Sequence, residues 1–172
     1  MKTINLVAMV LLGSSVAFTS CNDDDDYMME NQTFVTQASS SNNLEIQAGT
    51  LAMEQSSDTE VHHYGEHMVT DHGTAGEELM ALASDNEWQI PQNLLTAHQN
   101  MLNELVPLSG DQFDKAFMRI MVQSHQEAVA LFEQASRNNG VKDNELRAWA
   151  ADKLPVLRGH LQDAIELQQD IN

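Results

Sequence analysis

Residues 113–135 read FDKAFMRIMVQSHQEAVALFEQA, and they carry the clearest periodicity in the chain. Small or apolar side chains recur here every three or four residues, the spacing that keeps them on one face of an α-helix. The stripe consists of Phe113, Phe117, Ile120, Ser124, Ala128 and Leu131. It predicts a long amphipathic helix over residues 112–138, capped by Asp111 and ended by the Asn-Asn-Gly sequence at 138–140.

The same period extends over most of the chain after residue 30, and no stretch alternates as a strand would. Ser57 and Glu60 form a capping-box pattern for a second helix, and Asp143 is placed to cap the last one. The remaining predicted helices lie around residues 34–52, 58–84, 91–105 (beginning at Pro91) and 143–168. Four long helices, with a short helix connecting the second and third, predict an all-α, ferritin-like four-helix bundle over residues 33–170.

The N-terminal residues have the features of an export signal. Lys2 precedes an apolar run over residues 4–17, which is shorter than the roughly 20 residues that a membrane-spanning helix needs. Residues 1–20 are therefore predicted to be a secretory signal peptide rather than a short membrane anchor.

Cys21, the only cysteine, directly follows this segment and resembles the lipidated cysteine of bacterial lipoproteins; a free thiol is the alternative. The acidic run Asp23–Asp26 predicts a flexible tether over residues 21–32, and resembles the export signal of surface lipoproteins in Gram-negative bacteria. We therefore expect an outer membrane lipoprotein in the cell envelope, facing the periplasm or the surface, with the membrane as partner through Cys21.

Charge narrows the range of partners. The chain has 26 acidic and 8 basic side chains, a formal net charge of −18, and residues 21–114 contain no lysine or arginine. Such a surface repels nucleic acid and anionic lipid headgroups, so nucleic-acid binding is excluded, while a protein partner stays unspecified.

Four of the seven histidines fall within residues 62–72, HHYGEHMVTDH. On a helical wheel His63 and His67 point away from the apolar stripe, which predicts a solvated surface pair, whereas His72 lies inside the stripe. Each other long helix also turns one polar side chain inward at a similar distance from its connecting turn. These inward side chains are Glu45, His72, His125 and His160.

One carboxylate and three imidazoles form a suitable ligand set for a single zinc, copper or iron ion. The alternative is a buried hydrogen-bonded network, with Asp71, Asn42 or Lys153 as partners, that fixes the helix register. Methionines at helical spacing are predicted to fill the core, and a soft-metal copper site is a lesser alternative. These methionines are Met53, Met68, Met80, Met118 and Met121.

Four stretches together resemble one bacterial family, the domain of unknown function 4142, often described as a predicted outer membrane protein. They are SNNLEIQAGTLA (41–52), HMVTDH (67–72), the opening stretch 113–135 and LPVLRGHLQDA (154–164). The resemblance implies a ferritin-like bundle, and the family's motif positions fall on the same four inward residues. It implies no established activity.

No catalytic residue set is predicted. Ferritin-like di-iron sites use Glu-x-x-His on two helices, whereas Val69 and Leu157 occupy the positions three before His72 and His160. We therefore expect an exported, lipid-anchored binding or stress-related accessory module rather than an enzyme. A metal-binding protein and a purely structural or interaction module are the two alternatives.

Overall fold

The computed structural model describes residues 27–171, so the predicted signal peptide, Cys21 and most of the predicted acidic tether lie outside the described residues. The described part is all-α, apart from one isolated bridge between Met29 and Val141. None of its helices is long and apolar enough to cross a membrane. The helices are α1 (Asn31–Gln55), α2 (Thr59–Asp85), α3 (Thr96–Leu105), α4 (Gly110–Ala135) and α5 (Asn144–Asp170).

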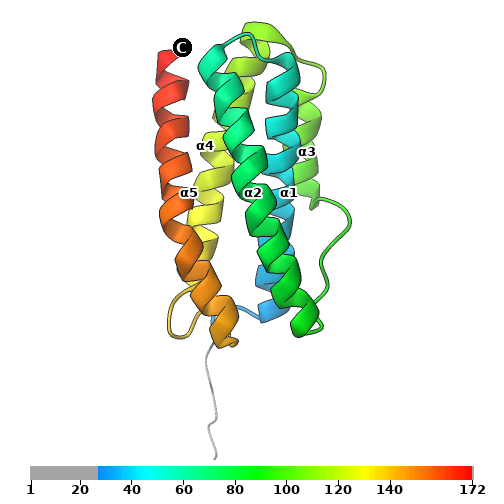
Figure 1. Ribbon diagram of the computed structural model, residues 1–172, viewed down its shortest axis with the longest axis vertical. Helices are drawn as coiled ribbons and strands as arrows, with labels where there is room; N and C mark the ends of the chain where they lie inside the picture. Colours follow the sequence, from blue (N-terminus) through cyan, green and yellow to red (C-terminus); the bar gives the residue numbers. More distant parts are fainter. Residues whose placement is uncertain (1–26, 172) are drawn as a thin grey trace, which may run out of the picture.

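The four long helices form the predicted bundle, and α3 is the predicted short connecting helix (Figure 1). Helices α1 and α5 run in one direction, and α2 and α4 run in the other. Helix α1 packs against α2 and α4, and α5 packs against α4 and α2. The connection from α2 to α4 returns along the outside of the bundle and carries α3 against α1. One long crossover of this kind is typical of ferritin-like bundles.

Side-chain caps decide where two of the long helices begin. The Asp58 carboxylate accepts hydrogen bonds from the backbone N–H groups of Glu60 (2.8 Å) and Val61 (3.1 Å), so Asp58 and not Ser57 is the cap of α2. The predicted cap of α5 is confirmed, since the Asp143 carboxylate accepts from the backbone N–H of Leu146 at 2.8 Å.

The predicted start of α4 is wrong by two residues. The helix begins at Gly110, and its N-cap position is Ser109 rather than Asp111. Asp111 instead accepts a hydrogen bond from the Ser57 hydroxyl at 3.0 Å, and the same hydroxyl lies 2.9 Å from a carboxylate oxygen of Asp114. The two acidic side chains therefore join the α1–α2 turn to the start of α4.

The short helix begins at Thr96, five residues later than predicted from Pro91. The Ser40 hydroxyl on α1 accepts from the backbone N–H of Leu95 at 2.8 Å and lies 2.7 Å from Nδ1 of His98. These tertiary hydrogen bonds hold the preceding residues against α1 in a non-helical conformation. Helix α4 also ends early, at Ala135, whose carbonyl accepts from the N–H of Val141 at 3.1 Å.

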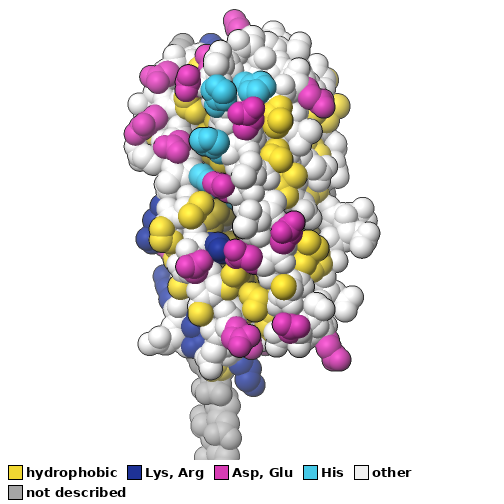
Figure 2. All heavy atoms as spheres, in the orientation of Figure 1, with side chains coloured by type: hydrophobic (Ala, Val, Ile, Leu, Met, Phe, Trp, Pro, Cys, Tyr) yellow, Lys and Arg dark blue, Asp and Glu magenta, His cyan; other side chains and the backbone are white. Residues whose placement is uncertain are grey.

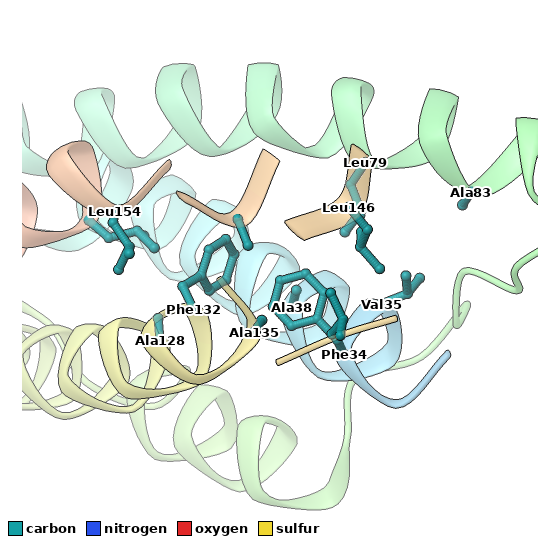
Figure 3. Close-up of a cluster of buried hydrophobic side chains, with 13 residues drawn as sticks. Phe34, Val35, Ala38, Leu79, Ala83, Ala128, Phe132, Ala135, Leu146 and Leu154 are labelled. Carbon is teal, nitrogen blue, oxygen red and sulfur yellow. The ribbon is translucent and has the colours of Figure 1, made fainter. Parts of the chain in front are cut away.

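The hydrophobic core consists of two clusters, one toward each end of the bundle. The first surrounds Phe34 on α1 and Phe132 on α4, whose rings meet edge to face with centroids 5.1 Å apart (Figure 3). The second surrounds Phe113 and Phe117 on α4, with Met68 on α2. Between the clusters lies a layer of buried polar side chains, described below.

Two of the predicted core methionines are on the surface. Met53 and Met80 are 41% and 52% exposed, whereas Met68, Met118 and Met121 are fully buried as predicted.

Helices α1 and α2 approach most closely where two glycines face each other. A Cβ atom at Gly49 would lie 2.7 Å from the carbonyl oxygen of Gly65, and one at Gly65 would lie 2.7 Å from the Cβ of Ala52. No side chain fits this crossing without displacing a backbone. The close approach holds α1 and α2 near the positions of Glu45 and His72.

Candidate metal centre

The four inward residues predicted from the sequence lie together in the polar layer between the two hydrophobic clusters. Their side chains come from all four long helices, and their exposed fractions are 1% for Glu45, 4% for His72, 0% for His125 and 7% for His160. The centroids of the three imidazole rings are 5.3–5.6 Å apart. The similar distances from the connecting turns, expected from the sequence, therefore do bring these side chains into contact.

His72 has hydrogen-bond acceptors on one of its two ring nitrogens. Its Nδ1 lies 3.1 Å from Oε2 of Glu45 and 3.1 Å from Oδ1 of Asn42. The orientation of the Asn42 amide is fixed because its Nδ2 donates to the His72 carbonyl at 2.8 Å. Two acceptors facing Nδ1 assign the ring proton to that atom, which leaves a lone pair on Nε2.

The other two histidines follow the same pattern. Nδ1 of His125 donates to the backbone carbonyl of Met121 at 2.9 Å and lies 3.6 Å from Oε1 of Glu45. Nε2 of His160 donates to Oδ2 of Asp71 at 3.0 Å. The remaining nitrogens, Nε2 of His125 and Nδ1 of His160, therefore also carry lone pairs.

These three lone-pair nitrogens are all buried, and none has a hydrogen-bond partner among residues 27–171. One ring nitrogen from each histidine lies within 4.8 Å of one from each of the others. Lone pairs cannot hydrogen-bond to one another, and a single water molecule has two protons for three acceptors. A cation with several coordination positions would satisfy all three at once.

Glu45 holds the layer together as an ionised carboxylate. Burial alone would raise its pKa, but His72, His125 and the hydroxyl of Ser124 outweigh burial and lower it. The Ser124 hydroxyl donates to Oε1 of Glu45 at 2.7 Å. Ser124 belongs to the predicted apolar stripe, and sequence reasoning missed its role because a serine there resembles any other small core residue.

The pKa values of His72 and His160 are lowered, so these two imidazoles are neutral at neutral pH. Burial lowers the pKa of His72 from 6.5 to about 4, and burial together with the neighbouring His125 lowers that of His160. Neutral imidazole is the form that binds metals, so protons compete little with a metal ion at His72.

Glu45 differs from the three histidines in where it lies. Its carboxylate contacts the protonated Nδ1 side of His72 and approaches the same side of His125, whereas the free nitrogens are on the other side of the rings. The group of side chains spaced to hold an ion accordingly contains His72, His125 and His160 without Glu45. Such carboxylates commonly orient metal-binding histidines and increase their basicity.

Two of the three network partners suggested by the sequence are present. Asn42 contacts His72 and Asp71 contacts His160, whereas Lys153 pairs with Glu78 and Asp152 instead. Tyr64 on α2 donates its hydroxyl to the backbone carbonyl of His160 at 3.0 Å. The layer is therefore held from four helices.

A cavity of about 160 Å³ adjoins the histidine triad, which consists of His72, His125 and His160. His72, His160 and Glu45 line its polar side, and apolar side chains such as Leu79 and Phe132 line the rest. Exposed and half-buried residues of α2 and α5 also contribute to its wall. The cavity therefore lies on the face that α2 and α5 form, shown in Figure 2.

The fold and this layer define the chain as an all-α bundle with a buried cluster of three histidines. The family model described as domain of unknown function DUF4142 matches residues 19–167, so the chain belongs to this family, as the four sequence stretches predicted. No curated protein matches the sequence.

Three solved structures share the fold. "CopM in the Cu(II)-bound form" has 17% sequence identity and a TM-score of 0.70, and the match covers 84% of this chain and 99% of that one. A DUF305 fragment from Deinococcus radiodurans has 16% identity and a TM-score of 0.69, covering 81% and 95%. A putative secreted DUF305 protein from Streptomyces coelicolor has 12% identity and a TM-score of 0.67, covering 80% and 89%.

Proposed function

We propose that this domain binds one divalent transition-metal ion through His72, His125 and His160, and that it stores or buffers that ion without catalysing a reaction. The observation that carries the proposal is the set of three buried ring nitrogens without partners among the described residues, on histidines that each bring one ring nitrogen within 4.8 Å of the others. Metal–nitrogen distances of about 2.0–2.1 Å place two nitrogens of one ion roughly 3.3–3.6 Å apart. Small rotations of the rings reach that spacing.

Charge supports a divalent ion. A buried cation requires compensation, and Glu45 and Asp71 each place a carboxylate against the protonated nitrogen of a triad histidine. Two negative charges near the layer balance the two positive charges of the ion. In this proposal Glu45 orients His72 and His125 instead of acting as the fourth ligand.

The donor set favours copper or zinc over harder ions. Three imidazoles suit both metals, and the usual order of affinities places Cu²⁺ above Zn²⁺. The structural neighbour CopM is in a Cu(II)-bound form, which agrees with copper at a bundle of this fold. A three-histidine set leaves a coordination position for water, supplied from the adjoining cavity.

A structural network is the competing function for the same residues. In that case the histidines would contribute to stability equally with and without metal. A ligand set instead makes the effect of replacing His72 on the melting temperature depend on metal.

The experiment is elemental analysis of the protein purified without chelator, together with thermal unfolding in the presence and absence of a chelator. We expect one tightly held equivalent of copper or zinc in wild type, its loss in His72→Gln, and its retention in the surface control His67→Gln. Protein that is empty and stays empty after metal addition, with equal destabilisation of His72→Gln under both conditions, would overturn the proposal.

We also propose that the domain acts in the cell envelope, attached to the outer membrane through Cys21. The signal-like residues 1–20 and the acidic residues 23–26 support this attachment. Membrane fractionation tests it: Cys21→Ser should release the protein into the soluble fraction or leave the signal uncleaved. A Cys21→Ser protein that still partitions with membranes contradicts lipid attachment.

A further inference from the structure

A second group of potential ligands lies near the start of α2. His62, His63 and Glu66 each offer a ligand atom within 4.8 Å of the others. Their side chains are 38%, 56% and 44% exposed, so the group is on the surface. The sequence predicted His63 and His67 as a solvated pair, whereas the structure groups His63 with His62 around one carboxylate.

Helix geometry explains the grouping. Glu66 is four residues after His62 and three after His63, and both spacings place side chains side by side on a helix surface. One carboxylate oxygen of Glu66 lies 2.9 Å from Nδ1 of His63, and the other lies 3.8 Å from Nδ1 of His62. Two imidazole nitrogens and a carboxylate, all on adjacent turns of α2, therefore lie around one point.

The surroundings favour a cation at this point. Residues 21–114 contain no lysine or arginine, and within the described part of the chain Glu66 pairs with the two histidines. The hydrogen bond from His63 lowers the pKa of Glu66, so this carboxylate stays ionised.

A helix N-terminus ordinarily disfavours positive charge. Here the carboxylate of Asp58 already caps the first N–H groups of α2. On the face shown in Figure 2, histidine and acidic side chains gather on the same upper part of the surface.

We propose that His62, His63 and Glu66 form a second, surface site for a divalent transition-metal ion such as Zn²⁺ or Cu²⁺. The ion takes the position of the proton between Nδ1 of His63 and Glu66. A charged His63 ring releases this proton to solvent, whereas a neutral ring binds the ion as the tautomer that carries its proton on Nε2. Nitrogen and carboxylate ligands together suit this class of ion. His63 is nine residues before His72, about 13.5 Å along the helix, so the surface site does not share its ion with the buried triad.

This site goes beyond the proposed function and does not depend on it. The test is equilibrium dialysis of the full protein against Zn²⁺, with the bound metal counted in wild type, Glu66→Gln, His63→Gln, His67→Gln and His72→Gln. We expect two ions per wild-type chain and one in Glu66→Gln and His63→Gln, while the matched control His67→Gln keeps both. Circular dichroism checks that every variant is folded.

Each outcome decides a separate point. Retention of both ions in Glu66→Gln overturns the surface site. Loss of one ion in His67→Gln instead assigns that ion to the His63–His67 pair and overturns the proposed ligands His62, His63 and Glu66. A single ion that is lost in His72→Gln also overturns the surface site but leaves the buried one. A single ion that survives in His72→Gln and disappears in Glu66→Gln upholds the surface site and overturns the proposed function.

Discussion

Acidification is expected to destabilise the metal-free protein through His72. Burial lowers the pKa of this imidazole from 6.5 to about 4, whereas in the unfolded chain it returns to its ordinary value of about 6.5. Between these two values the unfolded state binds a proton that the folded state excludes. The free energy of unfolding is therefore fully retained above pH 6.5 and falls as the pH falls toward 4.

The size of the effect follows from the two pKa values. At pH 5, protonation of this one group raises the equilibrium constant of unfolding by a factor of ~30. This factor corresponds to about 2 kcal/mol of lost stability. At pH 7 the same contribution is about 0.2 kcal/mol. A loss of about 2 kcal/mol is a large part of the 5–15 kcal/mol that stabilises a typical domain.

The assay is urea unfolding at pH 7 and pH 5, with a chelator present, for wild type and His72→Gln. Glutamine keeps an N–H donor for Glu45 but does not titrate, so wild type should lose about 2 kcal/mol more than the variant on acidification. Other titrating groups, including His160, are present in both proteins and largely cancel in the comparison. Equal losses in the two proteins would refute the reasoning, and His67→Gln should behave as wild type.

Three further changes probe the same layer and its support. Glu45→Gln should weaken binding of Cu²⁺ or Zn²⁺ by roughly 10–100-fold, because the oriented histidines lose their charged partner; titration calorimetry measures this, and unchanged affinity contradicts the orienting role. Gly65→Ala should cost about 1–3 kcal/mol in urea unfolding, since its Cβ would lie 2.7 Å from the Cβ of Ala52. A Cβ atom at Gly73 would have nothing within 4 Å, so Gly73→Ala should instead raise the free energy of unfolding by up to ~1 kcal/mol. Equal effects of the two substitutions would contradict the close crossing of α1 and α2. Metal at a hundred times its Kd should add about 2.7 kcal/mol to wild type and nothing to His125→Gln, as thermal unfolding will measure.

The fold was predictable because the apolar period is continuous through each long helix. Helix ends were less predictable, since they depend on which neighbouring side chain reaches the free N–H groups. Asp58 caps α2 although Ser57 fits the sequence pattern equally well. The start of α3 depends on Ser40, which is distant in sequence and leaves no local signal at Pro91.

The candidate site was predictable in position but not in role. Wheel angles and distances from the turns brought Glu45 and the three histidines to one level. They do not specify which ring nitrogen faces which neighbour, because that depends on rotamers chosen by packing. The sequence therefore placed Glu45 among the four candidate ligands, whereas we propose that it orients the histidines. A signal for Ser124 existed, since it is a hydroxyl in an apolar stripe directly beside an inward histidine.

The distribution of satisfied and unsatisfied atoms favours the proposed ligand site over a structural network. A buried hydrogen-bonded network that fixes the register of packed helices stabilises the fold most when every buried polar atom has a partner. In this layer each nitrogen that carries a proton has an acceptor on a neighbouring residue, and each nitrogen that carries a lone pair has none. The acceptors oppose a full flip of any ring, so within the described residues the three lone-pair nitrogens keep the cost of burial without a side-chain or backbone partner. A species that accepts lone pairs removes that cost, and binding it must therefore stabilise the fold.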